Sequence, residues 1–272
     1  MNTEKNSGDL NARLTSSAFW DSCYDGRVPA PFDDQNWRNY VSIQLTRLVE
    51  TLNLDQKEIC EVGGGDGEML AYFAKRHPSS KFSVIDFSPA GCELARNRAS
   101  REGVSLDVHQ ADLFSPPKEL LERFDLVISH GVVEHFTDLA NTMSAKKSLL
   151  RDGGKIFTLI PNFASPVYAF LCKHWSKTVY EDHVPHTMRS FLEGHKNAGL
   201  KPLNNGYLGS MEFGMLSMAM HGPERKSSID RQLYLWLTRL SKAVHLVEHK
   251  TVNLPATGLL SPFMYVVSTK TT

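Results

Sequence analysis

The chain has 272 residues, enough for one large domain, or a core domain with a cap, that buries a substantial core. Thirty basic and thirty acidic side chains give a formal net charge of zero, which disfavours a nucleic-acid partner, because such proteins usually carry a basic surplus. The four cysteines form no C-x-x-C pair, so neither a disulfide framework nor a metal site is expected. A polar start and the lack of a long apolar run predict a cytoplasmic protein.

Residues 1–54 precede any regular alternation, and we expect them to form N-terminal lid helices. Apolar residues near helical spacing predict a helix over about 35–53. Trp20, Tyr24 and Trp37 are candidates for the lid itself. Ordinary packing of the leading helices on the core is the alternative.

Short apolar runs alternate with helical patterns between residues 55 and 161, which is typical of βαβ units and a parallel sheet. The predicted strands lie at 57–64, 81–88, 106–113, 124–131 and 154–162. The predicted helices lie at 67–77, 89–103, 116–124 and 137–150.

The alternation loosens over residues 162–272, where we expect cap insertions together with the last helix and strands of the core. A helix is predicted over 186–200, and strands over 203–211 and 259–270. An amphipathic helix is predicted at 228–248. The apolar residues on one face of that helix are Ile229, Leu233, Trp236, Leu237, Leu240, Val244 and Val247.

A glycine-rich stretch, E-V-G-G-G-D-G at 61–67, follows the first predicted strand and precedes a helix. Glycines allow a tight turn and a close approach of a ligand, and ligands of open α/β sheets bind at this edge. A dinucleotide fingerprint is excluded, because its third glycine would fall on Glu68 or Leu70, and no G-K-[ST] follows to make a P-loop. For the loop alone, a purely structural turn is the alternative.

Acidic residues follow the next two strands. Asp86 ends the second strand, where a carboxylate can accept hydrogen bonds from both hydroxyls of a ribose. Asp112 follows the third strand. The order and spacing of these residues relative to the loop indicate a nucleotide site rather than solvated loop carboxylates.

The loop at 61–67, V-I-D-F-S-P-A-G-C-E-L-A-R from Val84 and S-H-G-V-V-E-H-F from Ser129 resemble class I S-adenosylmethionine-dependent methyltransferases, particularly the UbiG- and UbiE-like small-molecule branch. The resemblance covers about 57–160. It implies an α/β, Rossmann-like seven-stranded sheet with its last strand antiparallel and helices on both faces, plus the N-terminal lid and helical cap insertions. Residues 55–161 would be the cofactor-binding core, and 162–272 the acceptor-side cap.

The resemblance also implies S-adenosyl-L-methionine as cofactor. The glycine loop and Glu61 would hold its methionyl part, Asp86 its ribose, and Ser129 or His130 would lie near the sulfonium. The residues assigned to cofactor binding are Glu61, Gly63, Gly65, Gly67, Asp86, Phe87, Asp112, Leu113, Ser129 and His130.

Methyl transfer needs no protein nucleophile, because positioning supplies most of the acceleration. A general base helps when the acceptor is a phenol, an alcohol or a protonated amine. His135 is the best-placed candidate and His183 the second, ahead of His186. Each of these histidines is alternatively an ordinary pocket or surface residue.

The sequence favours O- or N-methylation of a small molecule and leaves the acceptor and the oligomeric state open. A protein or nucleic-acid methyltransferase is an alternative, although the chain lacks an N/D-P-P-Y/F tetrapeptide. A non-catalytic cofactor-binding subunit is another, although the loop is intact. A further alternative is a peripheral-membrane methyltransferase for a lipid such as a quinone, because Arg231, Arg239, Lys242 and Lys250 accompany the 228–248 helix.

Overall fold

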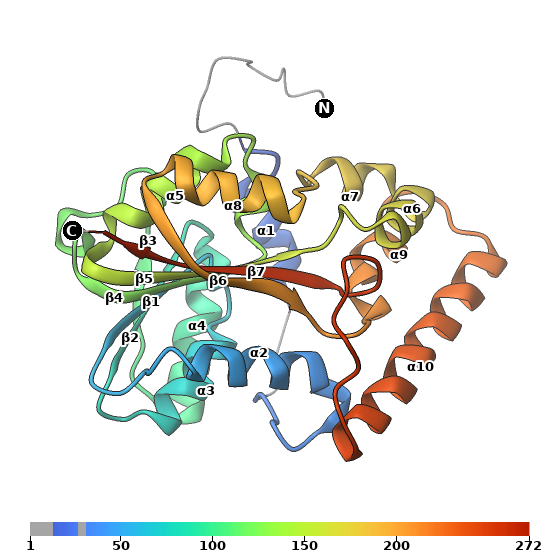
Figure 1. Cartoon of the computed structure of the whole chain (residues 1–272), viewed down its shortest axis with the longest axis horizontal. Helices are drawn as coiled ribbons and strands as arrows, with labels where there is room; N and C mark the ends of the chain where they lie inside the picture. Colours follow the sequence, from blue (N-terminus) through green and yellow to red (C-terminus); the bar gives the residue numbers. More distant parts are fainter. Residues whose placement is uncertain (1–12, 27–30, 272) are drawn as a thin grey trace.

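The computed structural model describes residues 13–26 and 31–271. A seven-stranded sheet runs through the centre in the order β3-β2-β1-β4-β5-β7-β6 (Figure 1). β7 is antiparallel to both neighbours, whereas the other described strands are mutually parallel, which confirms the predicted sheet. The strands are β1 (Glu58–Val62), β2 (Lys81–Asp86), β3 (Asp107–Gln110), β4 (Phe124–His130), β5 (Leu150–Pro161), β6 (Leu200–Leu208) and β7 (Phe263–Lys270).

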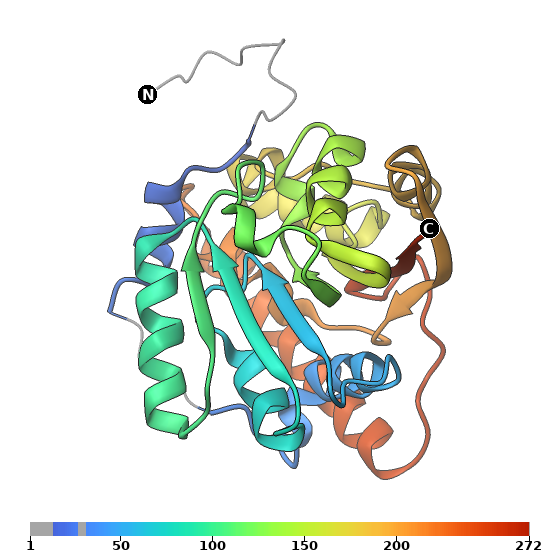
Figure 2. The ribbon, with the colours of Figure 1, turned by 90° about the vertical axis from the view of Figure 1, so that its left-hand side faces the viewer.

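Helices cover both faces of the sheet, as predicted (Figures 1 and 2). α2 (Tyr40–Glu50), α3 (Glu68–Arg76) and α4 (Pro89–Glu102) cover one face, and α5 (Leu139–Ser148) and α8 (Met188–Asn197) cover the other. Each face has its own cluster of buried apolar side chains. The remaining helices gather beyond the strand ends: α1 (Ser17–Tyr24), α6 (Pro166–Trp175), α7 (Lys177–Glu181), α9 (Ser217–Met220) and α10 (Ser228–Lys250).

The segment predicted as a helix over 116–124 forms only a 3-10 turn, η2 (Lys118–Leu120). The backbone leaves the turn at once, because Glu122 has a φ of 52° and donates its N–H to the carbonyl of Ser148. This connection therefore runs along the end of α5, and the helical prediction was wrong.

The segment predicted as a lid divides into two parts with different roles. α1 lies at the ends of the strands, whereas α2 packs Val41, Leu45 and Val49 into the core against the sheet. α2 begins at Tyr40 after a 3-10 turn, η1 (Trp37–Asn39), later than predicted. The α2 helix is thus part of the core.

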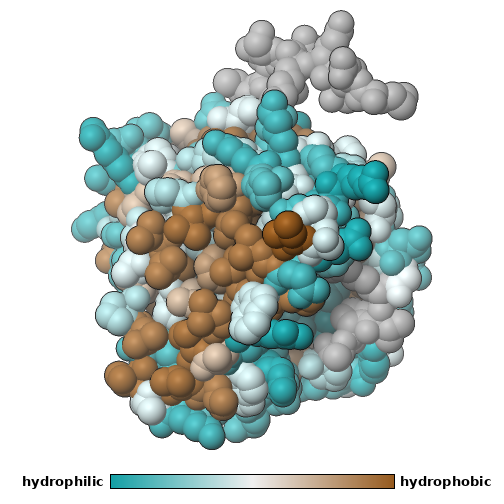
Figure 3. All heavy atoms as spheres, turned by 90° about the vertical axis from the view of Figure 1, so that its right-hand side faces the viewer, coloured by the Kyte–Doolittle hydropathy of each residue, from teal (hydrophilic) through white to brown (hydrophobic). Residues whose placement is uncertain are grey.

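α10 turns its apolar face outward. Ile229 is 77% exposed and Trp236 66% exposed, and Figure 3 shows the apolar surface on the side of the molecule where α10 lies. The buried side chains of the helix are polar: Ser241, His245 and Glu248. Among the described helices, none is long and apolar enough to cross a membrane. The predicted apolar face is therefore mostly exposed, although Leu237 packs against the cluster of buried side chains on α6 and α9.

Leu70→Ala and Leu240→Ala should separate the two kinds of apolar helix position. Leu70 is fully buried on α3, so truncation should cost about 2–5 kcal/mol of unfolding free energy. Leu240 is half exposed on α10, so its truncation should change the unfolding free energy by no more than about 0.5 kcal/mol. Urea unfolding measures both values. Equal losses would show that the outer face of α10 is buried in solution.

Candidate functional site

The glycine loop turns tightly between β1 and α3. Gly63, Gly65 and Gly67 have φ values of 66°, 50° and 67°, which disfavour any side chain. A Cβ on Gly63 would lie 2.5 Å from Val132 Cγ2, and one on Gly65 would collide with the hydroxyl of Tyr24. The loop is thus enclosed between the exit of β4 and α1.

Asp86 ties the loop to the end of β2. Its two carboxylate oxygens accept hydrogen bonds from the backbone N–H groups of Gly65 and Ser88, each at 2.8 Å. The side chain is buried, and this desolvation raises the pKa of Asp86 despite the two hydrogen bonds. The carboxylate is therefore fixed in place at the carboxyl edge of the sheet.

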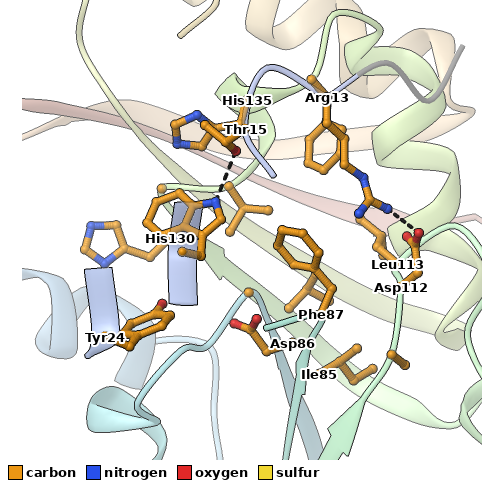
Figure 4. A pocket seen from close by; sticks show the side chains of 17 residues that line it. Arg13, Thr15, Tyr24, Ile85, Asp86, Phe87, Asp112, Leu113, His130 and His135 are labelled. Atoms are coloured by element: carbon orange, nitrogen blue, oxygen red, sulfur yellow. Dashed lines mark hydrogen bonds and ion pairs between the residues drawn. The ribbon is translucent and has the colours of Figure 1, made fainter. Parts of the chain in front are cut away.

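A cavity of about 230 Å³ opens beside Asp86, between the ends of β1 to β4 and the N-terminal segment (Figure 4). Six of the ten predicted cofactor residues line it: Gly63, Asp86, Phe87, Asp112, Leu113 and His130. Glu61, Gly65, Gly67 and Ser129 are not among its lining residues. Glu61, Gly65 and Gly67 belong to the glycine loop at 61–67.

Ser129 and His130, the two residues predicted to lie near the sulfonium, point to opposite faces of the sheet at the end of β4. His130 lines the cavity. Ser129 is buried, and its hydroxyl accepts a hydrogen bond of 2.6 Å from Lys146 Nζ on α5. Because successive side chains of a strand point to opposite faces, only His130 faces the cavity.

Glu61 lies buried at the start of the glycine loop. Its Oε2 has no hydrogen-bond partner within the described parts of the chain. Desolvation, followed by the nearby carboxylates of Asp66 and Asp86, raises the pKa of Glu61 to about 8. A buried carboxylate without a cationic partner is suited to receive a cation from a ligand.

The segment before α1 closes one side of the cavity. Arg13 forms an ion pair with Asp112, and its guanidinium lies 4.9 Å from the centre of the Phe87 ring (Figure 4). Sequence reasoning missed Arg13, because no local pattern links an N-terminal arginine to a carboxylate after β3.

α1 is anchored over the cavity by its contact with α4. The hydroxyl of Ser88 donates to Asp21 at 2.6 Å. Trp20 and Tyr24 line the cavity, whereas Trp37, the third predicted lid residue, is not among its lining residues. Trp37 instead begins η1 and pairs with the guanidinium of Arg38.

The two predicted catalytic histidines lie side by side. The ring centres of His135 and His183 are 4.5 Å apart, although 47 residues separate them in sequence. Burial, with a further contribution from His183, lowers the pKa of His135 to about 3, and burial also lowers the pKa of His183. His135 borders the cavity. His186, the third candidate, instead stacks against Phe191.

A second cavity, of about 220 Å³, lies next to the first between α2, the strand ends and α10. His130 lines both cavities. The second has apolar walls, including Leu45, Leu159 and Met215, together with the charged side chains of Arg38, Glu212 and Lys242. The cap region at 211–255 thus contributes directly to a pocket beside the nucleotide-type site.

Comparison with known proteins finds similarity to methyltransferases. A family described as "Methyltransferase domain" matches residues 60–156. The malonyl-[acyl-carrier protein] O-methyltransferase of Acetivibrio thermocellus is 30% identical over 129 residues, 44% of this chain and 43% of that protein. The ubiquinone biosynthesis O-methyltransferase of Stutzerimonas stutzeri is 28% identical over 128 residues, 47% of this chain and 54% of that protein. The chain thus spans about half the length of these relatives.

Solved structures share the fold at low identity. The geranyl diphosphate C-methyltransferase of Streptomyces coelicolor, solved with S-adenosyl-L-homocysteine, has a TM-score of 0.55 and 14% identity, and the match covers 84% of this chain and 76% of that one. The [4+2]-cyclase SpnF has a TM-score of 0.59 and 14% identity, with coverage of 91% and 85%. With its sheet order, glycine loop and matched domain, the chain is similar to the class I S-adenosylmethionine-dependent methyltransferases.

Proposed function

We propose that the chain is an S-adenosyl-L-methionine-dependent methyltransferase acting on the oxygen or nitrogen of a small molecule. The observation that carries this proposal is the cavity at which the glycine loop, the fixed carboxylate of Asp86 and His130 converge. A second cavity adjoins it at His130 and offers space for an acceptor.

The residues present fit the cofactor. Glu61 has an unpartnered buried oxygen for the α-ammonium group, and Asp86 retains acceptor capacity for ribose hydroxyls, because a carboxylate has about four lone-pair sites. Phe87 and Leu113 offer apolar surfaces to the base. The cofactor supplies an electrophilic methyl group on a sulfonium.

The acceptor is proposed to occupy the second cavity. Its apolar walls favour an acceptor with an apolar body, and Lys242 places a cation at its side. Lys242 Nζ is held 2.6 Å from Glu212 Oε2, so the cation is fixed in position. Alignment of acceptor and methyl group would supply most of the rate enhancement.

His135 and His183 are proposed to act on the group that receives the methyl. Their lowered pKa values keep both imidazoles neutral near pH 7. A pKa near 3 also makes His135 a weak Brønsted base, because an efficient base has a pKa near the working pH. Direct proton removal by His135 alone therefore does not explain its proposed role.

The proposed compartment is the cytoplasm. No disulfide joins the cysteines in the described part of the chain, Cys23, Cys60, Cys92 and Cys172, which suits a reducing environment.

The outward face of α10 favours a second candidate function, methylation of a membrane-borne lipid. Apolar side chains at Ile229, Trp236 and Leu240 are exposed along one face, and the helix lies beside the second cavity through Lys242. Arg231 and Arg239 are exposed on the same helix and suit anionic headgroups. A lipid held at this face would be close to the proposed acceptor cavity.

Asp86→Ala should weaken S-adenosylhomocysteine binding by about 1.5–3 kcal/mol, the range for hydrogen bonds to a charged group. Isothermal calorimetry measures the affinity. Glu93→Ala, which removes an exposed carboxylate of α4, is the matched control and should bind normally. Tight binding of NADH without any response to S-adenosylhomocysteine would refute the cofactor assignment.

S-adenosylhomocysteine affinity should rise with pH between about 6 and 8. Below pH 8 the free chain holds a proton on Glu61, and that proton must leave before the carboxylate can bind the α-ammonium group. Each pH unit below 8 should therefore weaken binding by up to about tenfold.

Calorimetry across this pH range tests the role of Glu61. In Glu61→Gln, which cannot ionise, the affinity should be low at pH 8 and nearly independent of pH. If the affinity of the unmodified chain for S-adenosylhomocysteine did not change with pH, Glu61 would not bind the α-ammonium group.

If α10 binds membranes, the full chain should sediment with vesicles of phosphatidylcholine and phosphatidylglycerol. The double substitution Trp236→Glu and Leu240→Glu should reduce binding roughly tenfold or more, because each buried apolar side chain contributes about 1.5–3 kcal/mol. Leu203→Glu, an equally exposed leucine on β6, is the control. Equal sedimentation of all three proteins would exclude this surface.

A further inference from the structure

Two segments that are distant in sequence are hydrogen-bonded to each other beside the cofactor cavity. The 3-10 turn η3 (Val133–His135) follows β4, and residues 182–184 follow α7. Val184 N–H donates to the carbonyl of Glu134 at 2.7 Å, and the ring of His135 bonds the carbonyl of Asp182, also at 2.7 Å. The relative position of the two segments is therefore fixed by the backbone.

The same contacts determine the tautomers of both histidines. Nδ1 of His135 lies against the carbonyl oxygen of Asp182, and Nδ1 of His183 lies 2.6 Å from the carbonyl oxygen of Val179. A carbonyl oxygen only accepts, so each Nδ1 carries the proton. In the neutral rings, each Nε2 therefore has a free lone pair, which is the arrangement found in metal-binding histidines.

Glu134 supplies a third donor at the same place. The residue is 2% exposed, and its Oε2 has no hydrogen-bond partner in the described parts of the chain. One donor atom each from Glu134, His135 and His183 lies within 4.8 Å of the others. A buried carboxylate oxygen without a hydrogen-bond partner, beside two imidazoles, is costly to keep without an occupant.

We propose that Glu134, His135 and His183 bind a divalent transition-metal ion, with zinc as the best match. Two imidazoles and one carboxylate form a common protein set for catalytic zinc. Ligands about 2.1 Å from a tetrahedral ion are about 3.4 Å apart, so the side chains need to move inward by about 1 Å. Mg²⁺ and Ca²⁺ prefer oxygen ligands and fit this set poorly.

The site is placed to act on the methyl acceptor. His135 lines the cofactor cavity, so a coordination position left open by three protein ligands would face that cavity. A zinc ion there lowers the pKa of a hydroxyl group that it contacts. The hydroxyl proton then leaves to solvent, the oxygen forms the bond to the methyl carbon, and the carbon–sulfur bond breaks with its electrons on sulfur. This catalytic role rests on the proposed methyl transfer, whereas binding of the ion does not.

Metal titration of the resting protein tests the site without an acceptor. The full chain, purified without a polyhistidine tag and stripped with a chelator, is titrated with Zn²⁺ against a chromogenic competitor and, separately, with Co²⁺ followed by visible absorption. We expect one equivalent of Zn²⁺ and a Co²⁺ absorption band typical of nitrogen and oxygen ligation. Mg²⁺ should not compete at millimolar concentration.

Substitutions assign the ligands. His183→Ala and Glu134→Gln should each lower Zn²⁺ affinity by about 100-fold or more, since even loss of a residue that only orients a ligand costs about 10–100-fold. His186→Gln changes a buried histidine of the same segment outside the cluster and should bind Zn²⁺ normally. S-adenosylhomocysteine binding, measured on every variant, confirms folding.

Two results would overturn the proposal: less than stoichiometric Zn²⁺ in the unmodified chain, or the same affinity in all variants. In the first case the cluster is a metal-free hydrogen-bonded trio in which the Glu134 carboxyl donates to an imidazole. Failure here leaves cofactor binding intact, so it is distinct from failure of the proposed methyl transfer.

Discussion

The site depends on the carboxylate of Asp86. One of its oxygens holds the N–H of Gly65 in the glycine loop, and the other holds the N–H of Ser88 at the start of α4. The hydroxyl of Ser88 in turn caps α4 through Gly91 N–H and donates to Asp21 of α1. The loop, the strand end, the helix and the covering segment are thus one hydrogen-bonded unit, and a disturbance at residue 86 reaches all four.

Burial of acidic groups in this region has an energetic consequence. Glu61 and Glu134 both have their pKa values raised to about 8, chiefly by desolvation. In the unfolded chain these carboxyls ionise near pH 4.5, so between about pH 4.5 and 8 the folded state binds more protons. Their contribution therefore makes the fold less stable as pH rises through that window. A cation that neutralises either carboxylate offsets this cost, as a ligand ammonium would at Glu61.

Features encoded by neighbouring residues were predictable, and features made by distant residues were not. The loop at 61–67, Asp86 and the strand–helix alternation follow from local sequence, and the structure has them except for the helix predicted over 116–124. The pairing of Arg13 with Asp112 and the contact between His135 and His183 depend on how separate segments meet. Glu134 was overlooked because an isolated carboxylate has no pattern until His183 is brought beside it.

α10 shows why periodicity predicts a helix but not its orientation. Its apolar stripe left the orientation open, and the side chains that the helix buries fully are polar: Ser241 Oγ accepts from Phe213 N–H, and the ring of His245 bonds the carbonyl of Met211. These bonds, with those of Glu248, satisfy the groups that the helix buries. The outward apolar side chains, such as Ile229 and Trp236, then remain exposed.

The reaction is decided by features outside the shared fold. The [4+2]-cyclase SpnF has a similar fold, so the fold alone does not specify methyl transfer. In this chain the features near the nucleotide-type site include the cavity between α2 and α10 and the Glu134, His135 and His183 cluster. His130 borders both cavities and His135 borders the first, so a methyl acceptor placed in the second cavity would meet side chains from the exit of β4. Under the proposed function, the choice of acceptor would depend on these groups and on the second cavity.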